Sequence, residues 1–292
     1  MNISRIRQIE TSSRGINTIL LLNDKRIATG SNDKAIRVYN ISTFECEINE
    51  TKAHDDFVIN LSQLDNNNLL SCSLDNTIKM WIIYKTSLKC IYTITNKASV
   101  LKVIPISNYT IAFCSTLNYI NIYNLKLKQV TTSLSGHKEF VRTIHYAKEK
   151  DILISGSDDE QLILWKSNKV HIIQNINPCF TNSIIQVNSD LIAIGGKGIV
   201  WIVNINECCI DKKIILEGIF HINSLITYKD YLICGTYLYK IVYIDLKHNA
   251  QYKVLSENIM SPCIDAMCYI GNDTFIEGSS RKNMNVWSII IQ

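Results

Sequence analysis

The stretch SGSDDEQLILW, residues 155–165, decides the fold of this chain. A small Ser/Gly turn and three acidic residues are followed by an apolar run that ends in Trp165. Ser155 and Asp159 follow His137 closely in the sequence, and these three residue types raise the possibility of a hydrolase active site. Whether the stretch occurs once or many times bears on both the fold and the possibility of a hydrolase site.

Similar stretches recur along the chain at a fixed spacing. They are ATGSNDKAIRVYN (28–40), LSCSLDNTIKMWI (70–82), AFCSTLNYINIYN (112–124) and ISGSDDEQLILWK (154–166). Their aromatic residues, Tyr39, Trp81, Tyr123 and Trp165, are 42 residues apart each time. A fixed period of this length is the sequence signature of a repeat architecture.

Weaker copies continue the series toward the C-terminus. They are AIGGKGIVWIVNI (193–205), ICGTYLYKIVYID (233–245) and IEGSSRKNMNVWS (276–288), with Val203, Ile244 and Trp287 in the aromatic position. The fifth copy displaces its Trp by two residues, to Trp201, which keeps that side chain on the same face of a strand. Seven copies of about forty residues account for the chain.

Each copy contains short segments of alternating apolar and polar residues, such as ILISGS, LILW and VHIIQNI, separated by turn residues. This pattern predicts four short antiparallel strands per copy. A sheet of that size cannot bury both faces alone, so the copies must stack on one another. Radial stacking leaves few exposed edges, and it predicts an all-β, seven-bladed β-propeller.

The two ends of the chain indicate how the ring closes. The last copy stops at Gln292, after its third strand, and the N-terminal segment SRIRQIET alternates apolar and polar residues. We expect this segment to supply the missing outer strand of the last blade. The prediction is one propeller over residues 1–292, with that outer strand in 1–14 and blades at roughly 15–53, 54–96, 97–136, 137–177, 178–218, 219–258 and 259–292.

The chain resembles the WD-repeat (beta-transducin) propeller family over essentially its whole length. The specific marks are SGHKEFV (135–141) before SGSDDEQLILW, and AHDDFV (53–58) before SCSLDNTIKMW. The resemblance implies two buried hydrogen-bonded tetrads, formed by His137, Ser155, Asp159 and Trp165 in the fourth unit and by His54, Ser71, Asp75 and Trp81 in the second. The chain departs from the family pattern because only two copies carry the histidine, and blades three, five, six and seven lack the turn Asp.

A tetrad and a catalytic triad use the same atoms differently. In the tetrad, Asp accepts from the imidazole and from turn amides, His contacts the Ser hydroxyl, and Ser contacts the Trp indole N–H. A serine hydrolase instead exposes its Ser oxygen in a cleft beside an oxyanion hole. Here the set occurs twice, each Ser would lie in a buried strand, and no G-x-S-x-G elbow is present. We therefore expect no catalytic residues and no enzyme.

Composition narrows the remaining classes. Hydrophobic residues make up 47% of the 292 residues and charged residues 19%, which is typical of a folded protein. The net charge of +4 is far from the clustered basic footprint of a dedicated nucleic-acid binder. The N-terminus has no apolar signal core, and no apolar run approaches the length of a membrane span.

Cysteine and histidine spacing disfavours disulfides, metals and cofactors. Several of the ten cysteines lie in apolar strand-like runs, and the Cys208-Cys209 pair lacks CxxC spacing. A reducing compartment fits best, with the cytoplasm as the expectation and the nucleus as the alternative. The histidines outside the tetrads, His145, His171, His221 and His248, show no ligand spacing, so we expect no metal site and no cofactor.

Function must then lie on the surfaces of the ring. The turns between second and third strands carry the candidate partner-binding residues, which are Asn32, Leu117, Tyr119, Asp158, Tyr237, Leu238, Tyr239 and Arg281. Leu and Tyr on tight turns indicate either a contact patch or side chains that fold back onto the neighbouring blade. The charges, acidic at blade four and basic at blade seven, favour an oriented protein partner.

We therefore expect a non-enzymatic scaffold or adaptor that binds proteins within a multiprotein assembly and is monomeric on its own. An RNA- or ribosome-associated propeller is the alternative, supported by the mild positive charge. A hydrolase ranks last.

Overall fold

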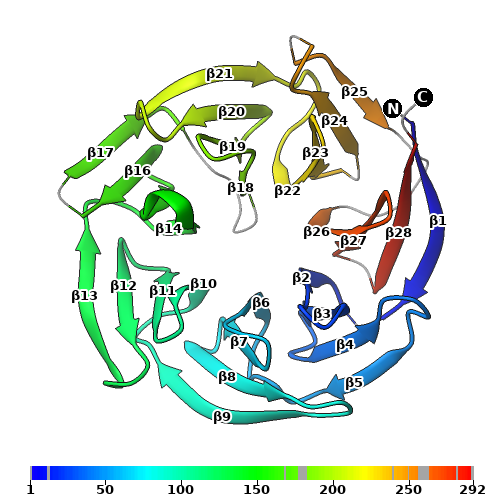
Figure 1. The fold of residues 1–292 in the computed structure, drawn as a ribbon, viewed down its shortest axis with the longest axis vertical. Helices are drawn as coiled ribbons and strands as arrows, with labels where there is room; N and C mark the ends of the chain where they lie inside the picture. Colours follow the sequence, from blue (N-terminus) through cyan, green and yellow to red (C-terminus); the bar gives the residue numbers. More distant parts are fainter. Residues whose placement is uncertain are drawn as a thin grey trace.

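The described residues form a ring of seven antiparallel sheets in a computed structural model of the chain (Figure 1). The structure describes residues 2–11, 14–167, 169–176, 183–238, 240–248, 250–255, 263–280 and 282–290. Each sheet is a blade of four strands, and its first strand lies nearest the ring axis. The seven-bladed propeller that the sequence predicts is confirmed.

The strands of blades one to four follow one another along the chain. Blade one contains β2 (Ile16–Leu21), β3 (Arg26–Ser31), β4 (Ile36–Asn40) and β5 (Cys46–Glu50). Blade two contains β6 (Val58–Gln63), β7 (Asn68–Ser73), β8 (Thr77–Ile83) and β9 (Leu88–Thr95). Blade three contains β10 (Val100–Ser107), β11 (Thr110–Ser115), β12 (Tyr119–Asn124) and β13 (Gln129–Ser135). Blade four contains β14 (Val141–Ala147), β15 (Ile152–Ser157), β16 (Gln161–Lys166) and β17 (Lys169–Gln174), with a 3₁₀ turn η1 (Lys148–Lys150) after β14.

The remaining blades keep the same order until the last. Blade five contains β18 (Ile184–Gln186), β19 (Leu191–Gly195), β20 (Ile199–Asn204) and β21 (Cys209–Ile215). Blade six contains β22 (Ile222–Tyr228), β23 (Tyr231–Thr236), β24 (Ile241–Asp245) and β25 (Tyr252–Leu255). Blade seven contains β26 (Ile264–Gly271), β27 (Thr274–Ser279), β28 (Asn283–Ile290) and the N-terminal β1 (Asn2–Glu10).

The N-terminal strand completes the last blade. β1 pairs with β28 from Asn2 opposite Ile290 to Glu10 opposite Asn283, and Figure 1 shows the two ends of the chain side by side at the rim. Ile3 is buried in the apolar cluster between blades six and seven. The predicted closure by the N-terminal segment is confirmed.

The core is a ring of interfaces between neighbouring blades. One apolar cluster fills each interface, and the cluster between blades seven and one joins Ile16 and Tyr39 to Ile276 and Val286. Second strands such as β7 are buried on both faces, whereas the outer strand β13 is exposed along nearly its whole length. A blade therefore depends on both of its neighbours for burial.

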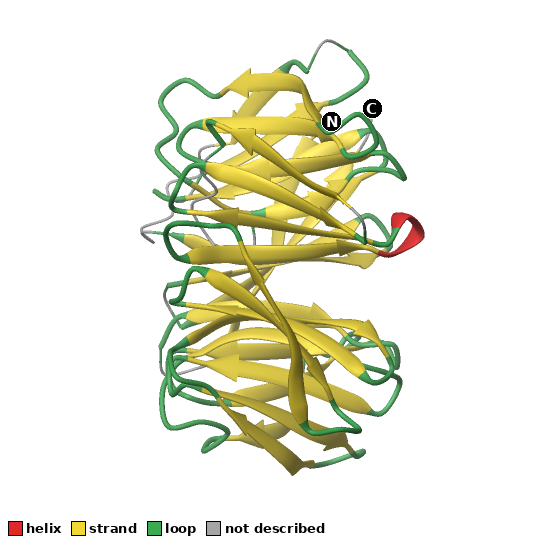
Figure 2. Cartoon of the chain, turned by 90° about the vertical axis from the view of Figure 1, so that its left-hand side faces the viewer, coloured by secondary structure: helices red, strands yellow, loops and turns green. Residues whose placement is uncertain are grey.

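The ring has two faces with different loops. The top face, as named here, is formed by the turns between second and third strands and by the loops that precede the first strands. The opposite face carries η1, the red turn in Figure 2. No helix in the described part of the chain is long and apolar enough to cross a membrane.

Candidate functional site

In blade two, the four residues of the expected tetrad form one hydrogen-bonded set. His54 Nδ1 lies 2.8 Å from Asp75 Oδ2, and His54 Nε2 lies 2.7 Å from Ser71 Oγ. The indole Nε1 of Trp81 donates to the same Ser71 Oγ at 2.8 Å. Thr77, which the sequence did not single out, donates to Asp75 at 2.7 Å and lies 3.1 Å from His54 Nδ1.

Blade four repeats this geometry with its own residues. His137 Nδ1 lies 3.0 Å from Asp159 Oδ2, and His137 Nε2 lies 2.7 Å from Ser155 Oγ. Trp165 Nε1 donates to Ser155 Oγ at 2.8 Å, and the backbone N–H of Lys138 donates to Asp159 Oδ2 at 2.8 Å. Each set ties the loop before a first strand to the turn between the second and third strands.

The electrostatics of the blade-four set favour a neutral imidazole and a charged carboxylate. Burial alone would raise the pKa of the Asp159 carboxyl, but the Lys138 amide and the His137 imidazole together hold that pKa below its ordinary value. Burial lowers the pKa of His137, although Asp159 opposes the shift. A neutral His137 protonated at Nδ1 donates to Asp159 and accepts from the Ser155 hydroxyl, so the buried groups are satisfied.

This burial argues against nucleophilic chemistry at either serine. Ser71 and Ser155 are both 0% exposed, and each Oγ already contacts an imidazole and an indole. A nucleophile needs an open approach for its substrate and a place for the developing oxyanion. Among the described residues, no group of three or more His, Cys, Asp and Glu side chains is arranged to hold a metal.

Blade one holds its turn Asp with an ion pair that the sequence reasoning missed. Arg37 Nη2 and Nη1 donate to the two oxygens of the Asp33 carboxylate, at 2.8 and 3.1 Å, and both side chains are mostly buried. Arg37 lies opposite Thr29, at the register position that Lys79 occupies in blade two. The sequence shows an Arg four residues after the turn Asp, but whether the two side chains meet depends on the strand register.

A second serine in the repeat also has a recurrent role. Ser31, Ser73 and Ser157 each donate from Oγ to a backbone carbonyl of the preceding loop, at 2.9, 3.1 and 3.2 Å. Each also accepts the backbone N–H of the turn Asp two residues later. These two hydrogen bonds therefore recur in the three blades with a turn Asp, whether or not the blade carries a tetrad histidine.

Blade seven replaces the tetrad by a different buried pair. Glu277 occupies the position of the tetrad Ser and accepts a hydrogen bond from the side-chain amide of Asn285, which lies opposite it. Both side chains are buried. The ring of Phe275 stacks on Trp287 with a centroid distance of 6.2 Å and an interplanar angle of 6°.

The structure places the candidate partner-binding residues in contrasting environments. Asp158 is engaged by Arg142, whose Nε donates to both carboxylate oxygens at 2.8 and 2.9 Å, so Arg142 offsets the acidic charge expected from Asp158. Asn32 Oδ1 accepts a hydrogen bond from Asn17 at 2.7 Å. Leu117 and Tyr119 are half-buried. Tyr239 and Arg281 lie outside the described residues.

Blade six presents exposed apolar side chains on the top face. The blade-six patch comprises Phe220, Tyr237 and Leu238, with exposed fractions of 59%, 40% and 50%. The ring of Tyr237 meets His221 edge-on, with centroids 6.2 Å apart, and its backbone N–H donates to the His221 carbonyl at 2.9 Å. Leu238 adopts φ = 67°, in the left-handed region that Gly and Asn occupy more readily.

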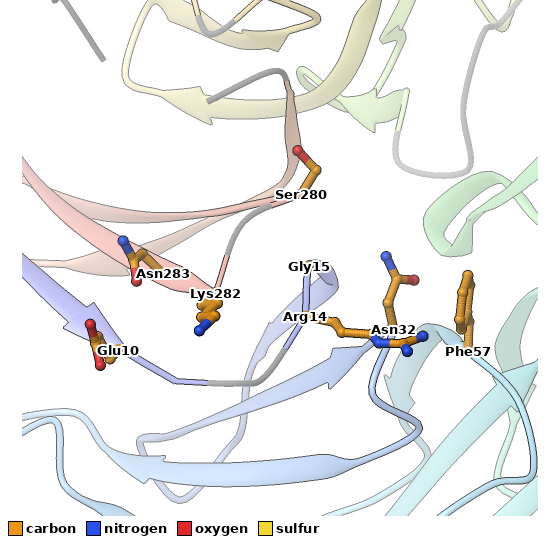
Figure 3. Close-up of a pocket in the computed structure, with 8 residues that line it drawn as sticks. All are labelled: Glu10, Arg14, Gly15, Asn32, Phe57, Ser280, Lys282 and Asn283. Atoms are coloured by element: carbon orange, nitrogen blue, oxygen red, sulfur yellow. The ribbon is translucent and has the colours of Figure 1, made fainter. Parts of the chain in front are cut away.

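A pocket opens next to this patch, between blades seven and one. Its volume is about 540 Å³, and Figure 3 shows Glu10, Lys282 and Asn283 on one side and Arg14, Asn32 and Phe57 on the other. The two blades approach closely beneath it, because a Cβ on Gly15 would lie only 2.7 Å from Ser280 Cα. Phe57 thus lies half-buried in this pocket wall, whereas Phe140 is exposed beside Arg142.

Comparison with known proteins agrees with this geometry. The model of the "WD domain, G-beta repeat" family matches residues 45–81 and 128–166, and these two segments contain the two tetrads. Each match begins one residue before the outer strand of one blade and ends in the third strand of the next.

Several characterised proteins are similar over part of the chain. Periodic tryptophan protein 2 of Arabidopsis thaliana is 28% identical over 142 residues, which are 48% of this chain and 16% of that protein. The ribosome biogenesis protein WDR12 homolog of Anopheles gambiae is 27% identical over 129 residues, 42% of this chain and 30% of that protein. Apoptotic protease-activating factor 1 of Rattus norvegicus is 27% identical over 143 residues, 48% of this chain and 11% of that protein.

These similarities cover less than a third of each relative's length, so they speak for the repeat units and not for whole proteins. The repeats, the tetrad geometry and the seven blades agree with one another. The chain is a seven-bladed β-propeller, and two of its repeats match the WD-repeat model.

Proposed function

We propose that this propeller is a non-enzymatic scaffold that binds protein partners through the blade six, seven and one sector of its top face. The observation that supports the proposal most is the blade-six patch, where three large apolar side chains stand exposed on neighbouring loops. Exposed apolar groups that gather on one surface are typical of protein interaction sites. The WD-repeat fold is in general an interaction fold without catalytic activity.

The absence of an enzymatic role is part of the same proposal. The two sets of residues that resemble a hydrolase triad are buried, and their serine oxygens are occupied by indole and imidazole groups. We expect the protein to be monomeric on its own and to reside in the cytoplasm. Effector activity would then come from its partners.

The turn of blade six offers a physical reason for selective exposure. Leu238 occupies the position that Asp75 holds in blade two, but it has no carboxylate that could accept hydrogen bonds within the blade. It also carries a left-handed backbone, which costs a branched apolar residue more than it would cost Gly.

Affinity capture from native extract tests the proposal. The double variant Tyr237→Ala/Leu238→Ser should lose partner capture by roughly thirtyfold, because buried Tyr anchors contribute about 2 kcal/mol to interfaces. The matched control is Val170→Ser/Ile172→Ser, which removes two apolar side chains that are equally exposed, at 54% and 52%, from the outer strand β17. Unchanged capture by the first variant, with its folding intact, would refute the role of the patch.

A ribosome-associated propeller is a second candidate. It is supported by one relative, which is named a ribosome biogenesis protein, and by the net charge of +4. A role in ribosome biogenesis would also favour the nucleus over the cytoplasm. RNA binding with a steep dependence on salt would support this candidate, because neutralised phosphates release counterions.

A further inference from the structure

The pocket between blades seven and one carries more positive than negative charge. Arg14 and Lys282 line it together with a single carboxylate, Glu10, and all three side chains are exposed. Within the described part of the chain, neither the Lys282 ammonium nor the Asn283 amide has a hydrogen-bond or ion-pair partner. The Lys282 ammonium and the Asn283 amide can therefore donate hydrogen bonds to an acceptor from outside the chain.

The pocket is built into the ring closure and is not a chance gap between mobile side chains. Thr11, just after β1, donates from both its backbone N–H and its Oγ1 to the Lys282 carbonyl at 3.0 Å. Asn32 is held by Asn17 and by the Gly15 carbonyl. The backbone on both sides of the pocket is thus fixed by hydrogen bonds between elements far apart in the sequence.

A short series of contacts joins this pocket to the blade-six patch. Tyr237 of the patch forms an antiparallel bridge with Cys263, which precedes the first strand of blade seven. The Cys263 carbonyl accepts the backbone N–H of Ser280 at 3.3 Å, and Ser280 lines the pocket. The apolar patch and the charged pocket therefore lie on adjoining parts of one surface.

We propose that this surface is bipartite and binds an acidic segment of a partner protein that also carries an apolar anchor. The apolar residue would cover the blade-six patch, and Asp or Glu side chains would enter the pocket. There they would accept hydrogen bonds from Lys282, Asn283 and Arg14. The inference rests on the proposed scaffold function and adds the chemistry of the partner.

The charge pattern favours carboxylates on a peptide over a nucleic-acid backbone. A polyanion needs a continuous stripe of cations along its length, whereas this pocket offers two cations beside one carboxylate. The neighbouring patch is apolar and carries Leu238 and Phe220, which suit an aliphatic or aromatic side chain. An acidic peptide with an apolar anchor matches both halves.

Site-specific photocrosslinking in native extract tests the proposal. A photoreactive amino acid is placed in the full chain at position 283 in one variant and at position 237 in another. We expect both positions to capture the same protein, with position 283 linked to a segment rich in Asp and Glu and position 237 linked to a nearby apolar residue. Capture of RNA, of a Lys/Arg-rich segment, of different proteins or of nothing at position 283 would overturn the proposal.

Charge variants separate this inference from the scaffold function itself. At low ionic strength, Lys282→Glu should weaken capture by roughly fivefold, and Glu10→Gln should strengthen it, because exposed charge pairs contribute modestly. Phosphatase treatment of the extract should leave capture unchanged, and a loss would assign the pocket to phosphate instead. If Lys282→Glu binds like the unmodified chain while Tyr237→Ala/Leu238→Ser does not, the scaffold function stands and the bipartite site is refuted.

Discussion

In blades two and four the top-face turn belongs to a buried hydrogen-bond network, whereas in blade six it presents an exposed apolar side chain. In blades two and four, the turn Asp faces inward, contacts a buried His, and is itself mostly buried. In blade six, the same register position holds Leu238, which is 50% exposed. The difference shows that a repeat can drop its internal network where the neighbouring interface still supplies burial.

Burial from the neighbours explains why blade six tolerates the loss. Cys234 occupies the position of the tetrad Ser there, and it packs with Ile222, Leu232 and Val242 in the cluster between blades five and six. An apolar residue at this position requires no hydrogen-bond partner, so the blade does not need a histidine to satisfy it. The turn above it is then free to present side chains outward.

The largest expected effect comes from the shared atom of the blade-four network. Ser155→Ala removes the acceptor of the Trp165 indole and the partner of His137 Nε2 at once. Two buried polar groups are then unsatisfied, so the free energy of unfolding should fall by about 3 kcal/mol. Urea denaturation measures it; a loss under about 0.5 kcal/mol, the size typical of a neutral surface change, would contradict the structural role of the set.

Asp159→Ala should have the next largest effect. His137 Nδ1 then has no acceptor, and the Lys138 amide loses its partner as well. We expect a decrease of about 2 kcal/mol in the free energy of unfolding. The exposed acid next to it provides the control, because Glu160→Ala removes a charge from the same turn without touching the histidine.

The corresponding change in blade two should be smaller. Thr77 Oγ1 already lies 3.1 Å from His54 Nδ1 and can accept from it once Asp75 is gone. Asp75→Ala should therefore cost about 1 kcal/mol, and the double variant Asp75→Ala/Thr77→Val should cost about as much as Asp159→Ala. Equal losses for the two single Asp variants would show that Thr77 does not substitute as an acceptor.

The pH dependence of stability should report on a third histidine. Burial lowers the pKa of His145 to about 4, and the charge of Lys102 acts in the same direction. The unfolded chain, with a His pKa of about 6.5, binds more protons between these values, so stability should fall as the pH is lowered from about 6.5 to 4. His145→Gln should flatten this part of the profile in urea denaturation.

The sequence predicted the parts of this molecule that repeat. The 42-residue spacing of Tyr39, Trp81, Tyr123 and Trp165 was sufficient for the blade count, because each blade buries the same positions against its neighbours. The tetrad residues were also recognisable, since their types and order are conserved between two copies within the chain. The N-terminal strand followed from the missing fourth strand of the last copy.

The non-repeating contacts were not predictable in this way. The pairs Arg37–Asp33 and Glu277–Asn285 each occur in one blade, and they depend on which residues lie opposite one another across two strands. The Arg142–Asp158 pair joins a first strand to a turn, and it changes the expected charge of blade four. Such pairs follow from register and side-chain reach, which spacing alone does not specify.

Hydrogen–deuterium exchange on the captured complex tests most directly whether blade six and its neighbours form the binding surface while the tetrads belong to the frame. We predict that the partner slows exchange in peptides covering residues 216–221, 236–240 and 280–284, and leaves those covering 135–141 and 155–165, which contain the blade-four tetrad, unchanged. Protection of the tetrad loops, with no change at blade six, would contradict the account.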